Sequence, residues 1–207
     1  MAPKDVARLW EELRHRDPEE KLDWIRQLAK DPTPDAVGVL LDALEQESWF
    51  LRDQAATALA SMGEFVLEPL LARLDSGLWF TRAAAAAALG RMGNADAAAP
   101  LTQVLRDPNR TVRDAAWDAL AALARAEVSA PAVAEAFAAL PERALRFALD
   151  GLYSRDADAG DRIAAFINDP ALRAAGERAG LERASGDDTG LSWLDVVGPD
   201  VEPGRAR

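Results

Sequence analysis

The sequence contains no cysteine and a single histidine, His15. Without cysteine the chain can form no disulfide, thiolate metal site or thiol nucleophile, and one histidine cannot build a multi-histidine zinc site. A Ser-His-Asp triad would depend on His15, which stands between Arg14 and Arg16 near the end of an expected surface helix. We therefore predict a non-enzymatic protein that holds neither a metal ion nor an organic cofactor.

Positive charge is also scarce, with 24 lysine and arginine residues against 35 aspartate and glutamate residues and a formal net charge of -11. Nucleic acids and anionic membranes both attract basic surfaces, so both partners are disfavoured. The most apolar stretch, 83–89, is seven residues long, whereas a transmembrane helix needs about 20. No apolar stretch typical of a signal peptide stands near the start. We predict a monomeric, soluble, cytoplasmic protein that binds neither nucleic acid nor membrane.

What the sequence does contain is an internal repeat. The segment 49–52, Trp-Phe-Leu-Arg, is followed thirty residues later by 79–82, Trp-Phe-Thr-Arg. After each arginine the same helical pattern follows, with alanines at +3 and +4, leucine at +7, methionine at +10 and glycine at +11. A third copy begins at Val112-Arg113 and a fainter, earlier one at Asp17-Pro18. Such a period is the signature of a repeat architecture.

The second half of each unit repeats as well, with anchors at positions 39, 69, 100, 131 and 162, spaced 30, 31, 31 and 31 residues apart. Apolar residues recur at helical spacing in both halves, so each unit is predicted to be two helices. The small alanines let neighbouring helices approach closely. Gly63 and Gly93 are placed to end the first helices in the left-handed conformation. Because one unit cannot bury its apolar stripe alone, the units are expected to stack.

This pattern resembles HEAT-like repeats, most closely the short bacterial kind named after phycobilisome lyases. The segment 89–123 carries the resemblance best, with its Leu-Gly-Arg-Met-Gly start and the later Asp107-Pro108 turn. The resemblance covers roughly residues 17–170 and implies an all-α, right-handed α-solenoid of about five helix pairs. We predict an N-terminal capping helix within 1–16, the repeat solenoid over 17–184 and a flexible acidic C-terminal tail over 185–207.

The Trp-Phe pairs are the most distinctive candidate for a binding surface. Trp49-Phe50 and Trp79-Phe80 begin consecutive first helices, so they recur along one edge of the expected solenoid, and Leu78 would extend them. Buried aromatic residues commonly dominate interface energetics, so a stepped row of rings suits a protein partner. The alternative is that one ring of each pair fills the gap between adjacent units. In either case we expect the tryptophan to be the more exposed ring.

The expected tail holds one apolar cluster, at 191–197, which includes Trp193 and Leu194. Two interpretations stay open. The segment could fold back onto the last helices or remain loose, or it could be a short linear motif that docks in a groove of a partner. Under the second interpretation, Trp193 and Leu194 are partner-binding residues.

Arginine recurs at one position of the first helices, as Arg52, Arg82 and Arg113. In HEAT-like repeats such an arginine usually pairs with an acidic group or a helix-end carbonyl of a neighbouring unit, which implies a structural role here. The polar positions expected on the second helices carry mixed charge and form no basic stripe of the kind that binds nucleic acid. They are Asp42, Glu45, Glu68, Arg73, Gln103 and Arg106.

The function that follows is a non-enzymatic protein–protein interaction module or scaffold, whose partner the sequence does not name. An alternative is implied only by the resemblance to lyase repeats, namely a bilin lyase subunit or related chaperone that hands a tetrapyrrole to a client protein. A purely structural role in an assembly is the third possibility. Fold alone does not choose among them.

Overall fold

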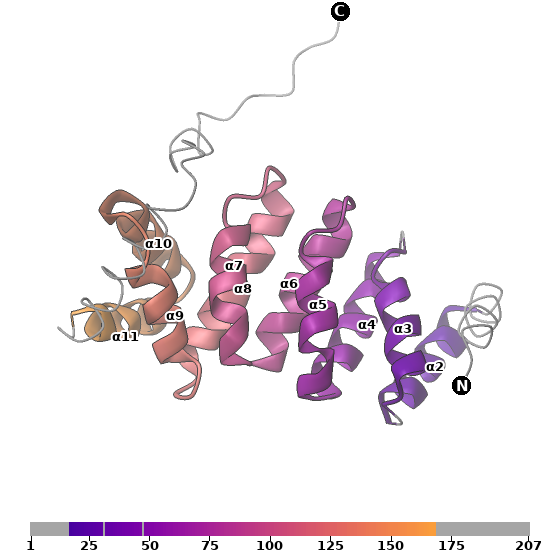
Figure 1. Cartoon of the computed structure of the whole chain (residues 1–207). Coiled ribbons are helices and arrows are strands. Elements are labelled where there is room, and N and C mark those ends of the chain that lie inside the picture. Colours follow the sequence, from indigo (N-terminus) through magenta and orange to yellow (C-terminus); the bar gives the residue numbers. More distant parts are fainter. Residues whose placement is uncertain (1–16, 31, 47, 169–207) are drawn as a thin grey trace, which may run out of the picture.

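The computed structural model describes residues 17–30, 32–46 and 48–168. Within these ranges every regular element is a helix and no strand occurs (Figure 1), so the all-α prediction is confirmed. The α-helices of this part of the chain are α2 (Pro18–Lys30), α3 (Pro34–Ala43), α4 (Trp49–Ser61), α5 (Leu67–Arg73), α6 (Trp79–Met92), α7 (Ala98–Val104), α8 (Arg110–Arg125), α9 (Ala130–Ala138), α10 (Glu142–Arg155) and α11 (Ala157–Ile167). The predicted capping helix and acidic tail lie outside the described residues.

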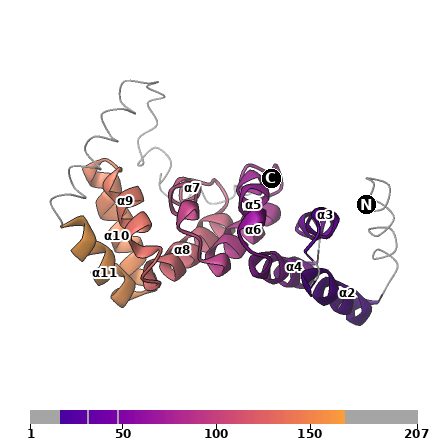
Figure 2. The same ribbon diagram turned by 60° about the horizontal axis from the view of Figure 1, so that its bottom comes forward.

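The helices alternate between two layers of an α-solenoid. The even-numbered helices α2 to α10, called the first helices below, pack each against the next, and the odd-numbered second helices lie beside them. Figure 2 shows α3, α5 and α7 above the row of α2, α4, α6 and α8. Each of α3, α5 and α7 packs against the first helix of the following unit, so successive units are tied together through both layers.

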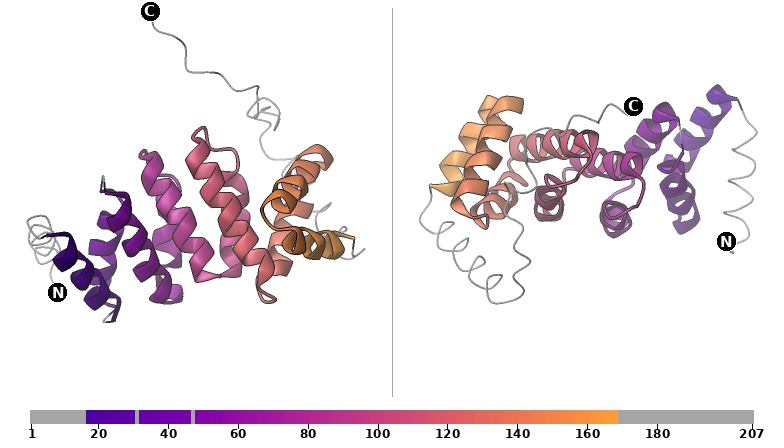
Figure 3. Two further views of the ribbon diagram at one scale, coloured as in Figure 1. Left: turned by 180° about the vertical axis from the view of Figure 1, so that it is seen from behind. Right: turned by 90° about the horizontal axis from the view of Figure 1, so that it is seen from above.

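At the centre of the solenoid, neighbouring first helices pack more closely than neighbouring second helices do. The helices α6 and α8 make the most extensive contact between any two elements of the described chain, whereas α5 and α7 barely touch each other. In the right-hand view of Figure 3, α5 and α7 project separately below the continuous row of first helices. The second helices are therefore splayed apart where the first helices are tightest.

Alanine and glycine account for the tight row of first helices. Ala85, Ala86 and Ala116 are completely buried. At the contact of α6 with α8, a Cβ atom added to Gly90 would lie 2.6 Å from the Cα atom of Ala119, closer than real Cβ atoms come to any heavy atom. The backbones can approach this far only because one side chain is a hydrogen atom and the other a methyl group.

Local capping sets several helix boundaries. The side chains of Thr33, Ser48 and Asp156 accept hydrogen bonds from backbone N–H groups in the first turns of α3, α4 and α11. Gly93 ends α6 at φ 72° and ψ 12°, the left-handed conformation that the sequence predicts. The same prediction is wrong for Gly63, which has φ 96° but ψ -170°. There the chain turns instead into a short 3-10 helix, Glu64–Val66, which leads into α5.

The repeated arginines secure the turns between units. Arg52, Arg82 and Arg113 each donate a guanidinium hydrogen bond to the backbone carbonyl six residues earlier. That carbonyl lies in the turn that precedes the arginine's own helix, so each arginine fixes the entry of the chain into a first helix. The structural role predicted for them is confirmed by these contacts.

Arg82 makes an additional ion pair with the next unit. Its Nε and Nη2 atoms donate to the two carboxylate oxygens of Asp107 at 2.6 and 3.0 Å, and the exposed side-chain fractions are only 15% and 8%. The hydrogen bond to Asp107 raises the pKa of Arg82. Asp107 also accepts the backbone N–H of Asn109 at 2.8 Å, so this bidentate pair joins α6 to the turn before α8.

Replacing Arg82 by methionine is expected to lower the free energy of unfolding by about 2 kcal/mol, because it leaves the Asp107 carboxylate largely buried without its cation. The matched control is Arg113→Met, since Arg113 donates only to the carbonyls of Asp107 and Pro108. Loss of those bonds should cost about 1 kcal/mol. Urea denaturation followed by circular dichroism measures both variants, and equal losses would contradict the importance of the ion pair.

Candidate functional site

Two aromatic pairs lie at the start of neighbouring first helices. The rings of Trp49 and Phe50 are 5.9 Å apart and edge-on, and those of Trp79 and Phe80 repeat this arrangement at 5.7 Å. Trp49 is 71% exposed and Trp79 43% exposed, whereas both phenylalanines are half-buried. The phenylalanine of each pair thus packs inward and holds the tryptophan outward, which confirms the predicted order of exposure.

The local sequence explains why these rings reach the surface. Trp49 is the first residue of α4, directly after the capping residue Ser48, and Trp79 is the first residue of α6, directly after Leu78. The side chain of Leu78 makes no capping hydrogen bond and is itself exposed. Leu78 therefore adds to the apolar surface beside Trp79, as the sequence predicts.

The tryptophans border an open groove of about 280 Å³ that runs along α6 and is flanked by the N-terminal parts of α4 and α8. The structure brings both tryptophans and Phe80 to the same groove, together with residues that the sequence analysis did not single out. We call this surface the aromatic groove. It is lined by Trp49, Arg52, Asp53, Ala56, Trp79, Phe80, Ala83, Ala84, Ala87, Arg91 and Thr111.

The unit of α6 lacks a charged residue that the units before and after it carry at the same position. Asp53 and Asp114 follow the repeated arginine in the units of α4 and α8, and Ala83 stands at that position in α6. Asp53 forms an ion pair with Arg91 across the α4–α6 contact, and Asp114 forms one with Arg155 of α10. Ala83 can make no such pair, and its methyl group leaves space between the rings.

Two arginines complete the aromatic groove. The guanidinium carbon of Arg52 lies 4.8 Å from the centre of the Phe80 ring, a cation–π contact that joins α4 to α6. Partial burial lowers the pKa of Arg52, yet an arginine keeps its charge at any physiological pH. Arg91 closes one side of the groove through its pair with Asp53. The surface is therefore apolar at its centre and charged at its margin.

A family model for HEAT repeats matches residues 6–77 and 67–152, which together span more than half of the chain. The chain belongs to the HEAT-repeat family. No curated protein matches it. HEAT repeats generally mediate protein–protein interactions, and the family is typically one of non-enzymatic scaffolds.

The aromatic row of this HEAT-repeat chain ends after two units. One period after Trp79-Phe80 the sequence has Arg110-Thr111, and one period later Pro141-Glu142. Thr111 still lines the aromatic groove, but it supplies a small polar side chain where the two preceding units supply rings. The groove is thus confined to one region of the solenoid.

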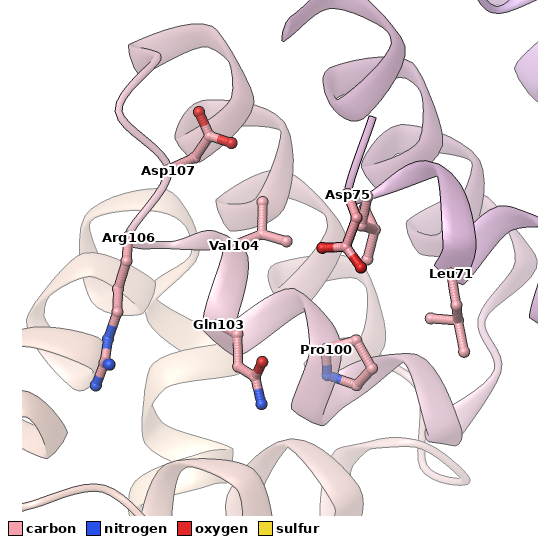
Figure 4. A pocket seen from close by; sticks show the side chains of 8 residues that line it. Leu71, Asp75, Pro100, Gln103, Val104, Arg106 and Asp107 are labelled. Atoms are coloured by element: carbon pink, nitrogen blue, oxygen red, sulfur yellow. The ribbon is translucent and has the colours of Figure 1, made fainter. Parts of the chain in front are cut away.

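A second open groove, of about 360 Å³, lies on the opposite layer between α5 and α7 (Figure 4). Leu71, Pro100 and Val104 line it together with Asp75, and Gln103, Arg106 and Asp107 are the remaining polar residues shown in Figure 4. This groove exists because α5 and α7 are splayed apart. Its lining mixes four apolar residues, including Leu74, with polar groups of both signs of charge, and no aromatic ring lines it.

Three of the six predicted polar positions of the second helices, Asp42, Glu45 and Arg73, pair with one another, and Gln103 and Arg106 line the second groove. Arg73 of α5 lies 4.0 Å from the carboxylate of Asp42 and 3.6 Å from that of Glu45, across the boundary with α3. Desolvation by burial, followed by the nearby Glu45, raises the pKa of Asp42, although Arg73 opposes this shift. These groups hold neighbouring units together, and they do not converge on a binding site.

Among residues 17–30, 32–46 and 48–168 no group of three or more histidine, cysteine, aspartate or glutamate side chains is arranged to hold a metal ion. None of the helices described there has the length and apolar character needed to cross a bilayer. Trp193 and Leu194, the remaining predicted contact residues, lie outside the described residues.

Proposed function

We propose that this HEAT-repeat chain is a non-enzymatic interaction module that binds a partner protein through the aromatic groove. The observation that carries the proposal is the outward position of Trp49 and Trp79, with Leu78 beside them, on a molecule whose other apolar side chains are mostly buried. Large exposed apolar side chains that cluster on one surface are typical of protein interfaces. The acidic balance of the chain favours a protein over nucleic acid or an anionic membrane as the partner.

The geometry of the aromatic groove suits it to act as an anchor site. A tryptophan can bury on the order of 150–250 Å² in a contact, and tryptophan is among the residues enriched at interface hot spots. Each tryptophan here is already held by an edge-on contact with its phenylalanine. Less side-chain freedom is then lost when a partner binds, which strengthens binding for the same contact area.

The test is to capture partners with the double variant Trp49→Ala/Trp79→Ala and to identify them by mass spectrometry. We expect at least one partner of the unmodified protein to bind the double variant about tenfold more weakly or worse, since truncation of hot-spot aromatics commonly has this effect. The matched control is Phe65→Ala, because Phe65 is 51% exposed but lies beyond the opposite end of α4.

Circular dichroism must show that both variants keep the helical content of the unmodified protein. Unchanged affinity of the double variant for every captured partner would show that the aromatic pairs serve packing alone. An equal loss for Phe65→Ala would show that binding depends on exposed apolar surface in general rather than on the aromatic groove.

We favour the interaction module over a bilin lyase subunit because the exposed tryptophans are directly explained by a protein partner. The lyase hypothesis is supported by the resemblance to phycobilisome-lyase repeats alone, and a shared fold does not carry a shared activity. We also propose that the protein acts as a monomer in the cytoplasm, which the composition of the chain supports.

A further inference from the structure

The chain that carries the aromatic groove has 39 further residues in its sequence after Asn168, the last described position. We propose that the segment 191–197 of the same chain occupies this groove and thereby competes with the partner protein. The docking itself does not depend on the proposed function, whereas the competition does.

The segment 191–197 has the apolar content that the groove requires. It reads Leu-Ser-Trp-Leu-Asp-Val-Val, so five of its seven residues are bulky and apolar, and glycines stand on both sides of it. Elsewhere in 169–207 the bulky aliphatic residues are single ones, Leu172, Leu181 and Val201. Trp193 offers one more ring to a groove already bordered by Trp49 and Trp79, and rings pack favourably edge-to-face or offset.

Charge favours the same pairing. The stretch 185–204 contains no lysine or arginine, and it carries five acidic residues, which are Asp187, Asp188, Asp195, Asp200 and Glu202. Beside the aromatic groove, Arg110 directly precedes the lining residue Thr111, and its side chain is 87% exposed. It lies 3.6 Å from Asp114, but exposed pairs of this kind are weak, so Arg110 can also attract an acidic segment. Arg91, at the margin of the groove, is already paired with Asp53, so Arg110 is the cation on which the charge argument rests.

The connection is long enough to reach the groove. Residues 169–190 provide 22 residues between Asn168 and the segment. If the predicted solenoid continues as a helix over 169–184, that helix spans about 24 Å, and residues 185–190 add about 13 Å as a random coil and at most about 20 Å when extended. The groove lies on α4, α6 and the start of α8, and Asn168 ends α11, which packs against α8, the neighbour of α6. Packed helices are spaced about 8–10 Å apart, so the required span is on the order of 20–30 Å.

A connection whose average length matches the span gives the docked segment a high effective concentration, on the order of millimolar. A contact that is too weak to hold two separate molecules together can therefore be well populated within one chain. The partner protein must then displace the segment, so removal of its apolar side chains should strengthen partner binding.

The absence of cysteine permits a test of docking without background. In the full chain, Thr111→Cys places a thiol in the aromatic groove and Ser192→Cys places one in the segment. The control pair is Val128→Cys/Ser192→Cys, because Val128 is exposed beyond the opposite end of α8. Mild oxidation is followed by non-reducing electrophoresis and intact mass, which distinguish a disulfide within one chain from a disulfide between two chains.

We expect the Thr111→Cys pair to form an intramolecular disulfide about tenfold faster than the control pair, as its higher effective concentration requires. Adding Trp193→Ser/Leu194→Ser should bring its rate down to that of the control. Equal rates of disulfide formation for the two cysteine pairs would overturn the proposal. A rate that the serine substitutions leave unchanged would overturn it as well. Disulfides between chains in place of those within one chain would also overturn it, because the occupant would then be a second copy.

The outcome is independent of whether a partner is ever found. A fast disulfide within the chain together with no partner for the aromatic groove would support docking and contradict the proposed function. If no such disulfide forms and Trp49→Ala/Trp79→Ala binds a partner more weakly, the proposed function is supported and the docking is contradicted.

Discussion

Replacing Ala86 by aspartate is expected to lower the free energy of unfolding by about 4 kcal/mol, which is the scale of a charge placed in a dry interior without a partner. Ala86 lies in the middle of α6, has no exposed surface and belongs to the continuous apolar core. Because the first helices pack closely, the larger side chain must also displace its neighbours. Thermal and urea denaturation, each monitored by circular dichroism, measure the loss.

The loss caused by Ala86→Asp should depend on pH in a predictable direction. Burial raises the pKa of the introduced carboxyl in the folded protein above its value of about 3.9 in the unfolded chain. The folded state then binds a proton more readily than the unfolded state, so the destabilisation grows as the pH rises above about 4 and shrinks below it. Each measurement is therefore compared with the unmodified protein at the same pH.

The matched control for this prediction is Ala99→Asp. Ala99 is an exposed residue in the first turn of α7, where a carboxylate is tolerated and is favoured by the helix dipole. Its effect should stay within about 0.5 kcal/mol. An Ala86→Asp variant with the same melting temperature as the unmodified protein would mean that the face of α6 that carries Ala86 does not point to the core.

Replacing Gly90 by leucine is expected to cost about 3 kcal/mol, because α6 and α8 must separate to admit any side chain at this position. The obstacle is main chain: an added Cβ would meet the Cα atom of Ala119 at 2.6 Å and its Cβ atom at 2.7 Å. At an ordinary position within a helix the same change would be stabilising, since glycine is the poorer helix former by about 1 kcal/mol. The sign of the effect therefore separates close packing from helix propensity.

Two further variants sharpen this second prediction. Gly77→Leu is the control, since a Cβ atom there meets nothing within 4 Å, and it should leave the midpoint of urea denaturation nearly unchanged. Ala119→Gly, added to Gly90→Leu, removes the methyl group but not the Cα atom, so we expect only partial rescue. Full rescue, or a stabilising Gly90→Leu, would contradict the closeness of α6 and α8.

Much of the fold could be predicted from the sequence because the information is local and repeated. The period from Trp49 to Trp79 marks two helix starts, and the structure begins α4 and α6 at these residues. Gly93 ends α6 in the predicted conformation. The arginine contacts were also predictable in kind, since each joins residues only six positions apart. Gly63 departs from the pattern because its ψ angle follows the 3-10 turn that comes next.

Only some residues of the candidate site could be predicted from the sequence. The tryptophans stand out by their repetition, but the groove also needs Ala83, whose only signal is that aspartate occupies the same position in the units before and after it. The ion pair of Arg91 with Asp53 joins residues 38 positions apart, and that of Arg82 with Asp107 joins residues 25 positions apart. No local pattern selects such partners among the many acidic residues of this chain.

The sequence by itself determined the helices, their period and which face of each is apolar, because helix formation and amphipathic patterning depend on residues a few positions apart. Only the tertiary structure decided how far each ring is exposed, where α5 and α7 splay apart and where the aromatic groove opens. Those features depend on how closely two backbones approach, which Gly90 and Ala119 set between α6 and α8. The repeat pattern makes these two helices neighbours, but the distance between their backbones follows only from how they pack.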